Sequence, residues 1–175
     1  GIDDVFIQGP FPDAHRIHWI PGDHGREFNG RLELYRGHTE EIDSPEITAS
    51  EVIGFTGPGG AESVIEKLRE QLGENYSVIR ATSPIDHRTV WIEVFPRGVH
   101  KGSGCEFIRN ELGIHEERTA AVGNDWNDTH MLNWASFPFV VENAPEALLR
   151  KYPSVPSNDQ GGVTAAAAKW LERIS

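Results

Sequence analysis

The strongest indication of the fold lies in the residues Ala121-Val122-Gly123-Asn124-Asp125-Trp126-Asn127-Asp128. A short apolar segment ends at a glycine, and two carboxylates and two amides follow it in the loop that opens the next predicted helix. In parallel α/β sheets ligands bind beyond the carboxyl ends of the strands, and such oxygens suit a hard cation such as Mg²⁺. The pattern favours a metal site, with Asp128 acting only as a helix cap as the alternative.

The segments around this loop alternate between helix and strand. Alternation of this kind predicts a parallel sheet covered by helices. After Pro96 only two strands are evident, which is fewer than a parallel sheet needs to bury both of its faces. Part of the sheet is therefore expected to be missing from this stretch. The expected helices are 102–112, 128–135, 145–151 and 163–174, and the expected strands are 119–122 and 137–141.

The first half of the chain has a different pattern, which predicts a small α+β layer. Residues 1–50 are rich in turn signals and suggest only short strands, at 16–20 and 31–36, with a tight turn at Asn29-Gly30. Apolar residues at helical spacing then predict a helix ending near Gly73. Strands are expected around it at 52–56, 76–81 and 89–95.

A second candidate site is the segment Val99-His100-Lys101-Gly102-Ser103-Gly104, where a predicted strand leads into a helix. A lysine in the first turn of a helix is unfavourable unless an anion is held nearby, because the helix N-terminus is already positive. Lys101 is therefore a candidate anion ligand. An exposed lysine in a glycine-rich turn is the alternative, since short glycine-rich strings are weak motifs.

Composition excludes several classes of function. The 175 residues carry 16 Lys and Arg against 27 Asp and Glu, a net charge of −11, which opposes binding to nucleic acid. No apolar run is long enough to cross a membrane. The single cysteine, Cys105, cannot form an intramolecular disulfide, so we expect a reducing, cytoplasmic setting.

Together these segments resemble the C-terminal half of a haloacid dehalogenase superfamily phosphatase, of the sugar-phosphatase-like branch with an α/β cap (class IIB type). The similarity covers about residues 90–175, residues 51–95 resemble the second part of the cap, and residues 1–50 match poorly. Its motifs are Val99–Gly104, Gly123–Asp128, Met131-Leu132, Val140–Ala144 and Ser157–Val163.

The resemblance implies a Rossmann-like half-core with helices on both faces over residues 98–175 and a cap over residues 1–97. It implies Mg²⁺-dependent hydrolysis of a small phosphorylated metabolite, above all a sugar phosphate. Lys101 would neutralise the phosphoryl group and the nucleophile, and Asp125 and Asp128 would hold the metal. Relatives often carry Asp at the position of Asn124, so whether Asn124 or Asp125 faces the metal stays open.

The resemblance also gives three asparagines a role in binding substrate. Asn127 would support the phosphate or the metal. Asn143 and Asn158 lie in the two later motifs and are assigned to the substrate with it.

One part of the family pattern is missing. The family uses one Asp as nucleophile and a second Asp, two residues later, as acid and base, and the chain contains no Asp-x-Asp. We therefore expect the nucleophile to lie outside these residues. The alternatives are a phosphate-binding module that has lost turnover, and a half-core that pairs with a second copy or another chain.

The remaining candidates are three histidines near the start, His15, His18 and His24, for which the sequence favours ordinary polar loop positions. Their spacing matches no standard metal-ligand set. A sugar-contacting role for this loop is the alternative.

Overall fold

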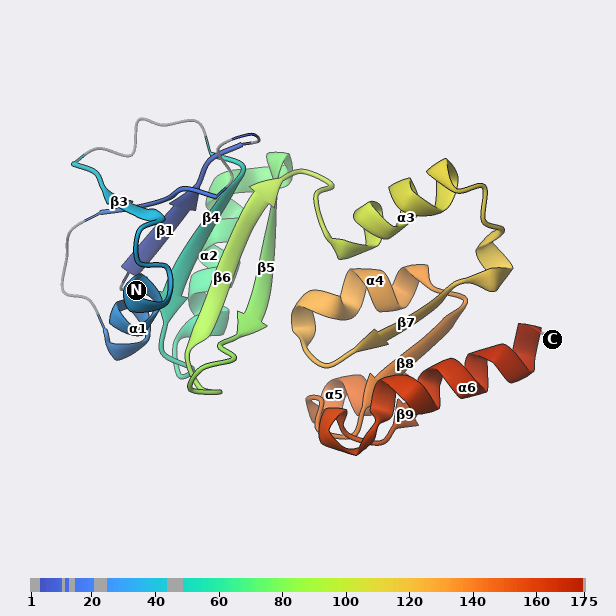
Figure 1. The fold of residues 1–175 in the computed structure, drawn as a ribbon. Coiled ribbons are helices and arrows are strands. Elements are labelled where there is room, and N and C mark those ends of the chain that lie inside the picture. The colour runs from blue at the N-terminus through green and yellow to red at the C-terminus, as the bar shows by residue number, and fades with distance from the viewer. Residues whose placement is uncertain (1–3, 11, 13–14, 21–24, 44–48, 175) are drawn as a thin grey trace. The chain divides into compact units, whose positions relative to one another are not determined.

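The computed structural model describes residues 4–10, 12, 15–20, 25–43 and 49–174. The chain divides at one point into two compact units, Gly1–Gly98 (unit 1) and Val99–Ser175 (unit 2), drawn from blue to green and from yellow to red in Figure 1. Each unit has a hydrophobic core of its own. The fold is therefore described one unit at a time.

Unit 1 is built on a six-stranded sheet with the order β3-β2-β1-β4-β6-β5. Neighbouring strands are antiparallel, except for the parallel pair of β2 and β3. The strands are β1 (Asp4–Gln8), β2 (Ile17–Trp19), β3 (Thr39–Glu41), β4 (Glu51–Thr56), β5 (Tyr76–Thr82) and β6 (Val90–Pro96), and the helices are α1 (Arg26–Leu34) and α2 (Ala61–Leu72).

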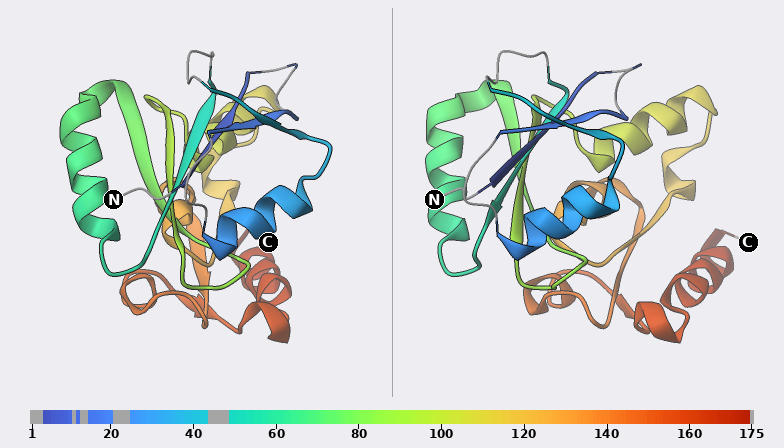
Figure 2. Two further views of the ribbon diagram at one scale, coloured as in Figure 1. Left: turned by 90° about the vertical axis from the view of Figure 1, so that its left-hand side faces the viewer. Right: turned by 60° about the vertical axis from the view of Figure 1, so that its left-hand side comes forward.

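The two helices of unit 1 cover opposite faces of this sheet, as Figure 2 shows. Successive residues of a strand point to opposite faces, and β6 shows the consequence. Ile92 of β6 packs with Ile65 of α2. The adjacent residue, Trp91, packs on the other face with Phe28 of α1 and Phe55 of β4. The predicted helix and the three predicted strands of residues 51–96 are confirmed.

The prediction for residues 31–36 is wrong, because these residues belong largely to helix α1 and not to a strand. The predicted turn at Asn29-Gly30 lies inside the same helix. Phe28 is the reason: it is fully buried against Phe6, with ring centroids 4.5 Å apart, and against Phe55 at 5.7 Å. Burial of this ring on the sheet favours the helix that the local alternation of apolar residues did not indicate.

Unit 2 has a parallel sheet with the order β7-β8-β9, flanked by α4 and α6 (Figure 1). The predicted α/β class is confirmed. The strands are β7 (Ala120–Gly123), β8 (Phe137–Val141) and β9 (Ser154–Val155), and the helices are α3 (Lys101–Glu111), α4 (Thr129–Trp134), α5 (Glu146–Leu149) and α6 (Gly162–Ile174).

The sheet of unit 2 has one strand more than the two that the sequence predicts. β9 is only two residues long, and prolines at 153 and 156 enclose it, so its sequence is typical of a loop. Its Val155 is nonetheless buried in the core of unit 2, together with Leu132 of α4 and Val140 of β8. These contacts fix the third strand beside β8.

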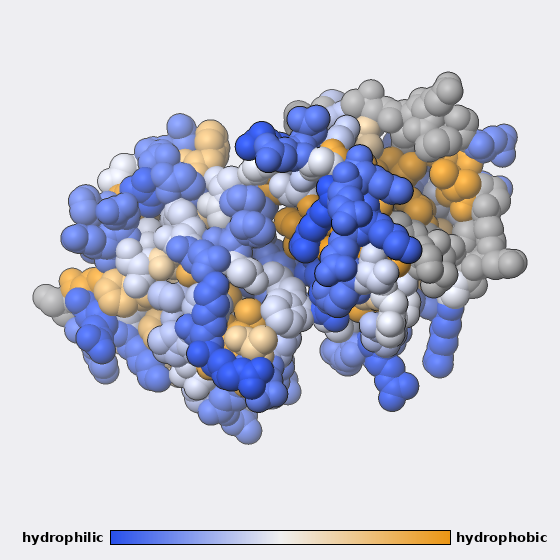
Figure 3. Space-filling view, turned by 180° about the vertical axis from the view of Figure 1, so that it is seen from behind, coloured by the Kyte–Doolittle hydropathy of each residue, from blue (hydrophilic) through white to orange (hydrophobic). Residues whose placement is uncertain are grey.

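The surface is described by its hydropathy. The face drawn in Figure 3 is mostly hydrophilic and is interrupted by separate hydrophobic areas. Among the described residues, no helix combines the length and the apolar character that a bilayer crossing requires.

Candidate functional site

The acidic loop begins where β7 ends and continues through the short 3₁₀ helix Trp126–Asp128 into α4. Gly123 allows this sharp turn, because a Cβ atom there would lie 2.7 Å from the Cβ of Asp128 and 3.0 Å from the side chain of Leu132. The glycine therefore brings Asp128 directly against the end of the strand. Asp125 and Asp128 are both buried, at 8% and 4% exposure.

Asp128 is the centre of the site, since both of its carboxylate oxygens accept hydrogen bonds. The ammonium group of Lys101 donates to Oδ1 at 2.5 Å. The backbone N–H groups of Asn124 and Asp125 donate to Oδ2 at 2.8 Å and 3.4 Å. The Asp125 side chain in turn accepts from the backbone N–H of Asp128, which makes the loop a closed capping box.

Lys101 reaches Asp128 because it is the first residue of α3, and α3 packs closely on α4. A Cβ atom at Gly102 would lie 2.7 Å from the carbonyl oxygen of His130, so only glycine permits this approach. His100 caps the helix: its ring accepts from the backbone N–H of Ser103 at 3.0 Å. The sequence-predicted lysine and acidic loop are thus in direct contact.

The donor set fits a magnesium ion. The described residues contain no cluster of three or more His, Cys, Asp or Glu side chains able to hold a metal. Mg²⁺, however, is commonly held by one or two carboxylates together with water and phosphate oxygens. Asp125 and Asp128 carry two negative charges against the one positive charge of Lys101, so this buried pair can accept a further cation.

The asparagines lie in the loops after the three parallel strands, at one edge of the sheet. Asn127 lies half-buried in the loop after β7. Asn143 follows β8 and Asn158 follows β9, and these two exposed residues meet where the backbone N–H of Asn158 donates to the Asn143 side chain at 3.4 Å. The structure gives a contact between Asn143 and Asn158, and gives none that joins either of them to Lys101.

Sequence reasoning missed two residues beside the site, His100 and His130. Their rings stack with centroids 4.2 Å apart and an angle of 16°. Burial, and then the charge of His100, lowers the pKa of His130. Histidine is an unusual helix cap, and the stacking depends on the distance between α3 and α4, so no local signal indicates either residue.

The early histidines have separate surroundings. His15 lies on the wall of a pocket in unit 1, and the ring of His18 lies 3.9 Å from the Glu40 carboxylate. His24 lies outside the described residues.

Comparison with known proteins places the chain in a family. The model of the haloacid dehalogenase-like hydrolases matches residues 25–166, which is most of the chain. The chain therefore belongs to the haloacid dehalogenase-like hydrolase family, as its sequence motifs indicate.

Two curated relatives and one solved structure illustrate the similarity. M6_Spy0533 of Streptococcus pyogenes serotype M6, described as a candidate phosphatase, is 28% identical over 80% of this chain and 49% of its own length. The 5-amino-6-(5-phospho-D-ribitylamino)uracil phosphatase YbjI of Escherichia coli K12 is 33% identical over 40% of this chain and 27% of its own length. The chain thus spans about half, or less, of the curated relatives it matches.

The fold agrees with that of solved family members. The structure of the subclass IIB sugar phosphatase BT4131 superposes with a TM-score of 0.70, covering 99% of this chain and 62% of BT4131. The two sequences are 15% identical, so this match concerns the fold.

Proposed function

We propose that this chain forms the phosphate-binding and metal-binding part of a Mg²⁺-dependent phosphatase that acts on a small phosphorylated metabolite. The observation that carries the proposal is the contact of the Lys101 ammonium with the buried carboxylate of Asp128, next to Asp125, at the carboxyl end of β7. A cation and two buried carboxylates at the end of a parallel strand suit a metal-bound phosphate.

Each residue has a distinct role in this proposal. Asp125 and Asp128 hold the Mg²⁺, with Asn124 at the same loop. Lys101 is half-exposed, so its ammonium can contact a phosphoryl oxygen as well as Asp128. When bound, Mg²⁺ would neutralise charge on the transferring phosphoryl group. Asn127, Asn143 and Asn158 would donate hydrogen bonds to the substrate from the same edge of the sheet.

The nucleophile is proposed to come from outside these 175 residues, because the chain contains no Asp-x-Asp. An external carboxylate, from a further segment of the protein or a second chain, would take the phosphoryl group from the ester oxygen. The second Asp of the same Asp-x-Asp would protonate that oxygen as the alcohol leaves. Water would then release inorganic phosphate from the acyl phosphate and restore the carboxylate. Lys101 would stabilise the negative charge in both steps.

The substrate class is a proposal that the named relatives support. BT4131 is named a sugar phosphatase, and YbjI acts on a phosphorylated ribitylamino compound. We infer that a phosphorylated sugar or sugar-like metabolite is the substrate here. Unit 1 would serve as the cap that selects it, and the single cysteine supports a reducing compartment.

Calorimetric titration of the 175-residue chain with Mg²⁺ tests the metal assignment. We expect D125A and D128A each to weaken Mg²⁺ binding about tenfold or more, since even outer partners of metal ligands contribute that much. D86A is the matched control, because Asp86 is an exposed aspartate in a turn of unit 1. If circular dichroism shows that D125A and D128A are folded and both bind Mg²⁺ with unchanged affinity, the metal assignment is wrong.

A phosphate-binding module without turnover is the second candidate, and the missing Asp-x-Asp favours it. The mass of the native polypeptide distinguishes the two. A polypeptide heavier than 19.5 kDa, or a co-purifying chain that contains Asp-x-Asp, would support hydrolysis. A solitary chain of that mass which binds phosphate with Mg²⁺ and releases none from sugar phosphates would support the module.

A further inference from the structure

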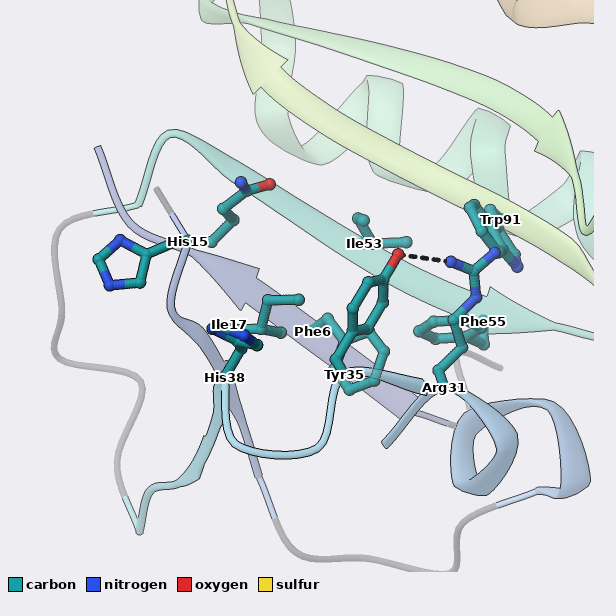
Figure 4. Close-up of a pocket in the computed structure, with 10 residues that line it drawn as sticks. Phe6, His15, Ile17, Arg31, Tyr35, His38, Ile53, Phe55 and Trp91 are labelled. Carbon is teal, nitrogen blue, oxygen red and sulfur yellow. Dashed lines mark hydrogen bonds between the residues drawn. The ribbon is translucent and has the colours of Figure 1, made fainter. Parts of the chain in front are cut away.

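Unit 1 contains a pocket of about 390 Å³ on the face of its sheet that α1 covers, shown in Figure 4. This volume falls in the roughly 300–1,000 Å³ range of small-molecule sites. Strands β1, β2, β4 and β6, the last turn of α1 and the segments just before β2 and just after α1 line it, with Phe6, Gln8, His15, Ile17, Arg31, Tyr35, His38, Ile53, Phe55 and Trp91.

The walls of the pocket are aromatic and apolar. Phe6, Phe55 and Trp91 stand side by side on the sheet, with the Phe6 and Phe55 rings 5.3 Å apart and the Phe55 and Trp91 rings 5.9 Å apart. Tyr35 lines the pocket as well, beside Arg31 (Figure 4). Edges and faces of aromatic rings at these separations favour a flat unsaturated ligand, which can add a further ring to the cluster.

Arg31 and Trp91 line one end of the pocket, and each of these side chains has a buried N–H group without an acceptor. The Arg31 guanidinium lies 3.8 Å from the centre of the Trp91 ring, and its Nη1 donates to the Tyr35 hydroxyl at 2.8 Å. Its Nε and the indole nitrogen of Trp91 are buried without a hydrogen-bond partner. Glu27 balances the charge of Arg31, with an oxygen 3.6 Å from Nε, beyond hydrogen-bond distance.

The other end carries polar groups that can also donate. His15, His38 and the Gln8 amide lie there, away from Arg31 in Figure 4. Both histidines are exposed, so they stand at the mouth of the pocket. The ten lining residues include an arginine and two histidines and no carboxylate, and a site of this composition suits an acceptor with negative charge.

We propose that this pocket binds a small aromatic carboxylate, with its flat body against Phe6, Phe55 and Trp91 and its carboxylate accepting from the donors of the pocket. Buried donors without acceptors are costly, and a ligand oxygen would satisfy them. The proposal is independent of the phosphate chemistry of unit 2, because every residue that lines the pocket belongs to unit 1.

The probe is 2-naphthoate, a flat bicyclic carboxylate, and the measurement is nuclear magnetic resonance of the 175-residue chain. The chain has five tryptophans, so the spectrum holds five indole N–H signals, and W91F identifies the signal of Trp91. We expect 2-naphthoate to shift that signal in a saturable way. The neutral analogue 2-naphthalenemethanol should bind about tenfold more weakly, because it lacks the charged acceptor.

Two variants test the contacts, and each has a matched control. R31K keeps the charge but loses the planar guanidinium, and H38A removes an imidazole at the mouth; both should weaken 2-naphthoate binding at least about threefold. R97K and H115A change an exposed arginine and an exposed histidine elsewhere and should leave the affinity within about twofold.

The following results would overturn the proposal. They are the absence of saturable binding, binding that does not move the Trp91 signal, or binding equally strong for the neutral analogue. Because Arg31 is nine-tenths buried beside Glu27, R31K can unfold. In that case H38A alone decides, since His38 is exposed, and unchanged affinity in H38A counts against the site.

Discussion

At the scale of single residues, the carboxyl group of Glu51 shows how sheet geometry changes ionisation. Glu51 begins β4, and Glu93 of β6 lies opposite Ile53, two residues further along β4. Both carboxylates therefore point to the same face of the sheet. Burial, and then repulsion by Glu93, raises the pKa of Glu51 from its ordinary value of 4.5 to about 7.

This shift predicts a pH dependence of stability. A carboxyl group whose pKa is higher in the folded state stabilises the fold below its unfolded pKa, and this stabilisation is lost as the pH rises through the folded value. The free energy of unfolding should fall between pH 4.5 and about 7. The loss is on the order of 1–2 kcal/mol, after allowance for solvent screening at this half-buried group.

Urea unfolding at several pH values checks the prediction in the E51Q variant. In E51Q the free energy of unfolding should fall less between pH 4.5 and about 7, because glutamine does not ionise. E70Q changes an exposed glutamate on α2 and should show the same fall as the unmodified chain. If E51Q and the unmodified chain lose stability in parallel over this range, another group is responsible.

At the scale of elements, helix α3 contains two glycines, and only one of them lies where α3 packs on α4. A Cβ at Gly102 would lie within 3 Å of the backbone carbonyl of His130, whereas a Cβ at Gly104, two residues later in α3, would meet nothing within 4 Å. G102A should therefore force the helices apart and reduce stability by about 1–3 kcal/mol. G104A should instead add about 0.5–1 kcal/mol, since alanine favours helix over glycine.

Thermal unfolding of the two variants measures this difference. G102A should also break the contact of Lys101 with Asp128, because Lys101 is attached to the helix that moves and Asp128 lies at the start of its neighbour. Equal melting temperatures for G102A and G104A would show that the helices do not need the close approach.

The elements also show which parts of the fold could be predicted from sequence. Helix α2 and strands β4, β5 and β6 follow regular patterns of apolar residues, and their patterns predict them correctly. Helix α1 depends on Phe28 packing against strands far away in sequence, and β9 depends on Val155 reaching a distant core. A pattern within a few residues cannot contain such contacts.

The candidate site divides in the same way. Lys101, Asp125 and Asp128 lie in compact motifs, and the family resemblance indicates their contact before the structure shows it. The stacked His100 and His130 and the pocket around Arg31 arise from elements that meet in space. A sequence motif contains no information on contacts between distant elements, so these two features could not be predicted from the sequence.

At the scale of the whole molecule, the chain contains separate cores on consecutive stretches of sequence. Leu132 is fully buried in the core of unit 2, and Ile65 is 1% exposed in the core between α2 and the sheet of unit 1. Each core is thus completed by residues of its own unit. Such an arrangement favours local unfolding of each unit as a cooperative block.

Hydrogen exchange followed by mass spectrometry can measure this independence. L132A should destabilise unit 2 by about 2–5 kcal/mol, since it leaves a cavity in a packed core. Slowly exchanging amides of β7 and β8 should then exchange about 30-fold faster or more, as each 1.4 kcal/mol is tenfold. Amides of β4 and β6 should be unaffected, and I65A should give the reverse pattern. If either variant accelerates exchange equally in both units, the two cores unfold as one, and the division of the chain into separately stable parts is wrong.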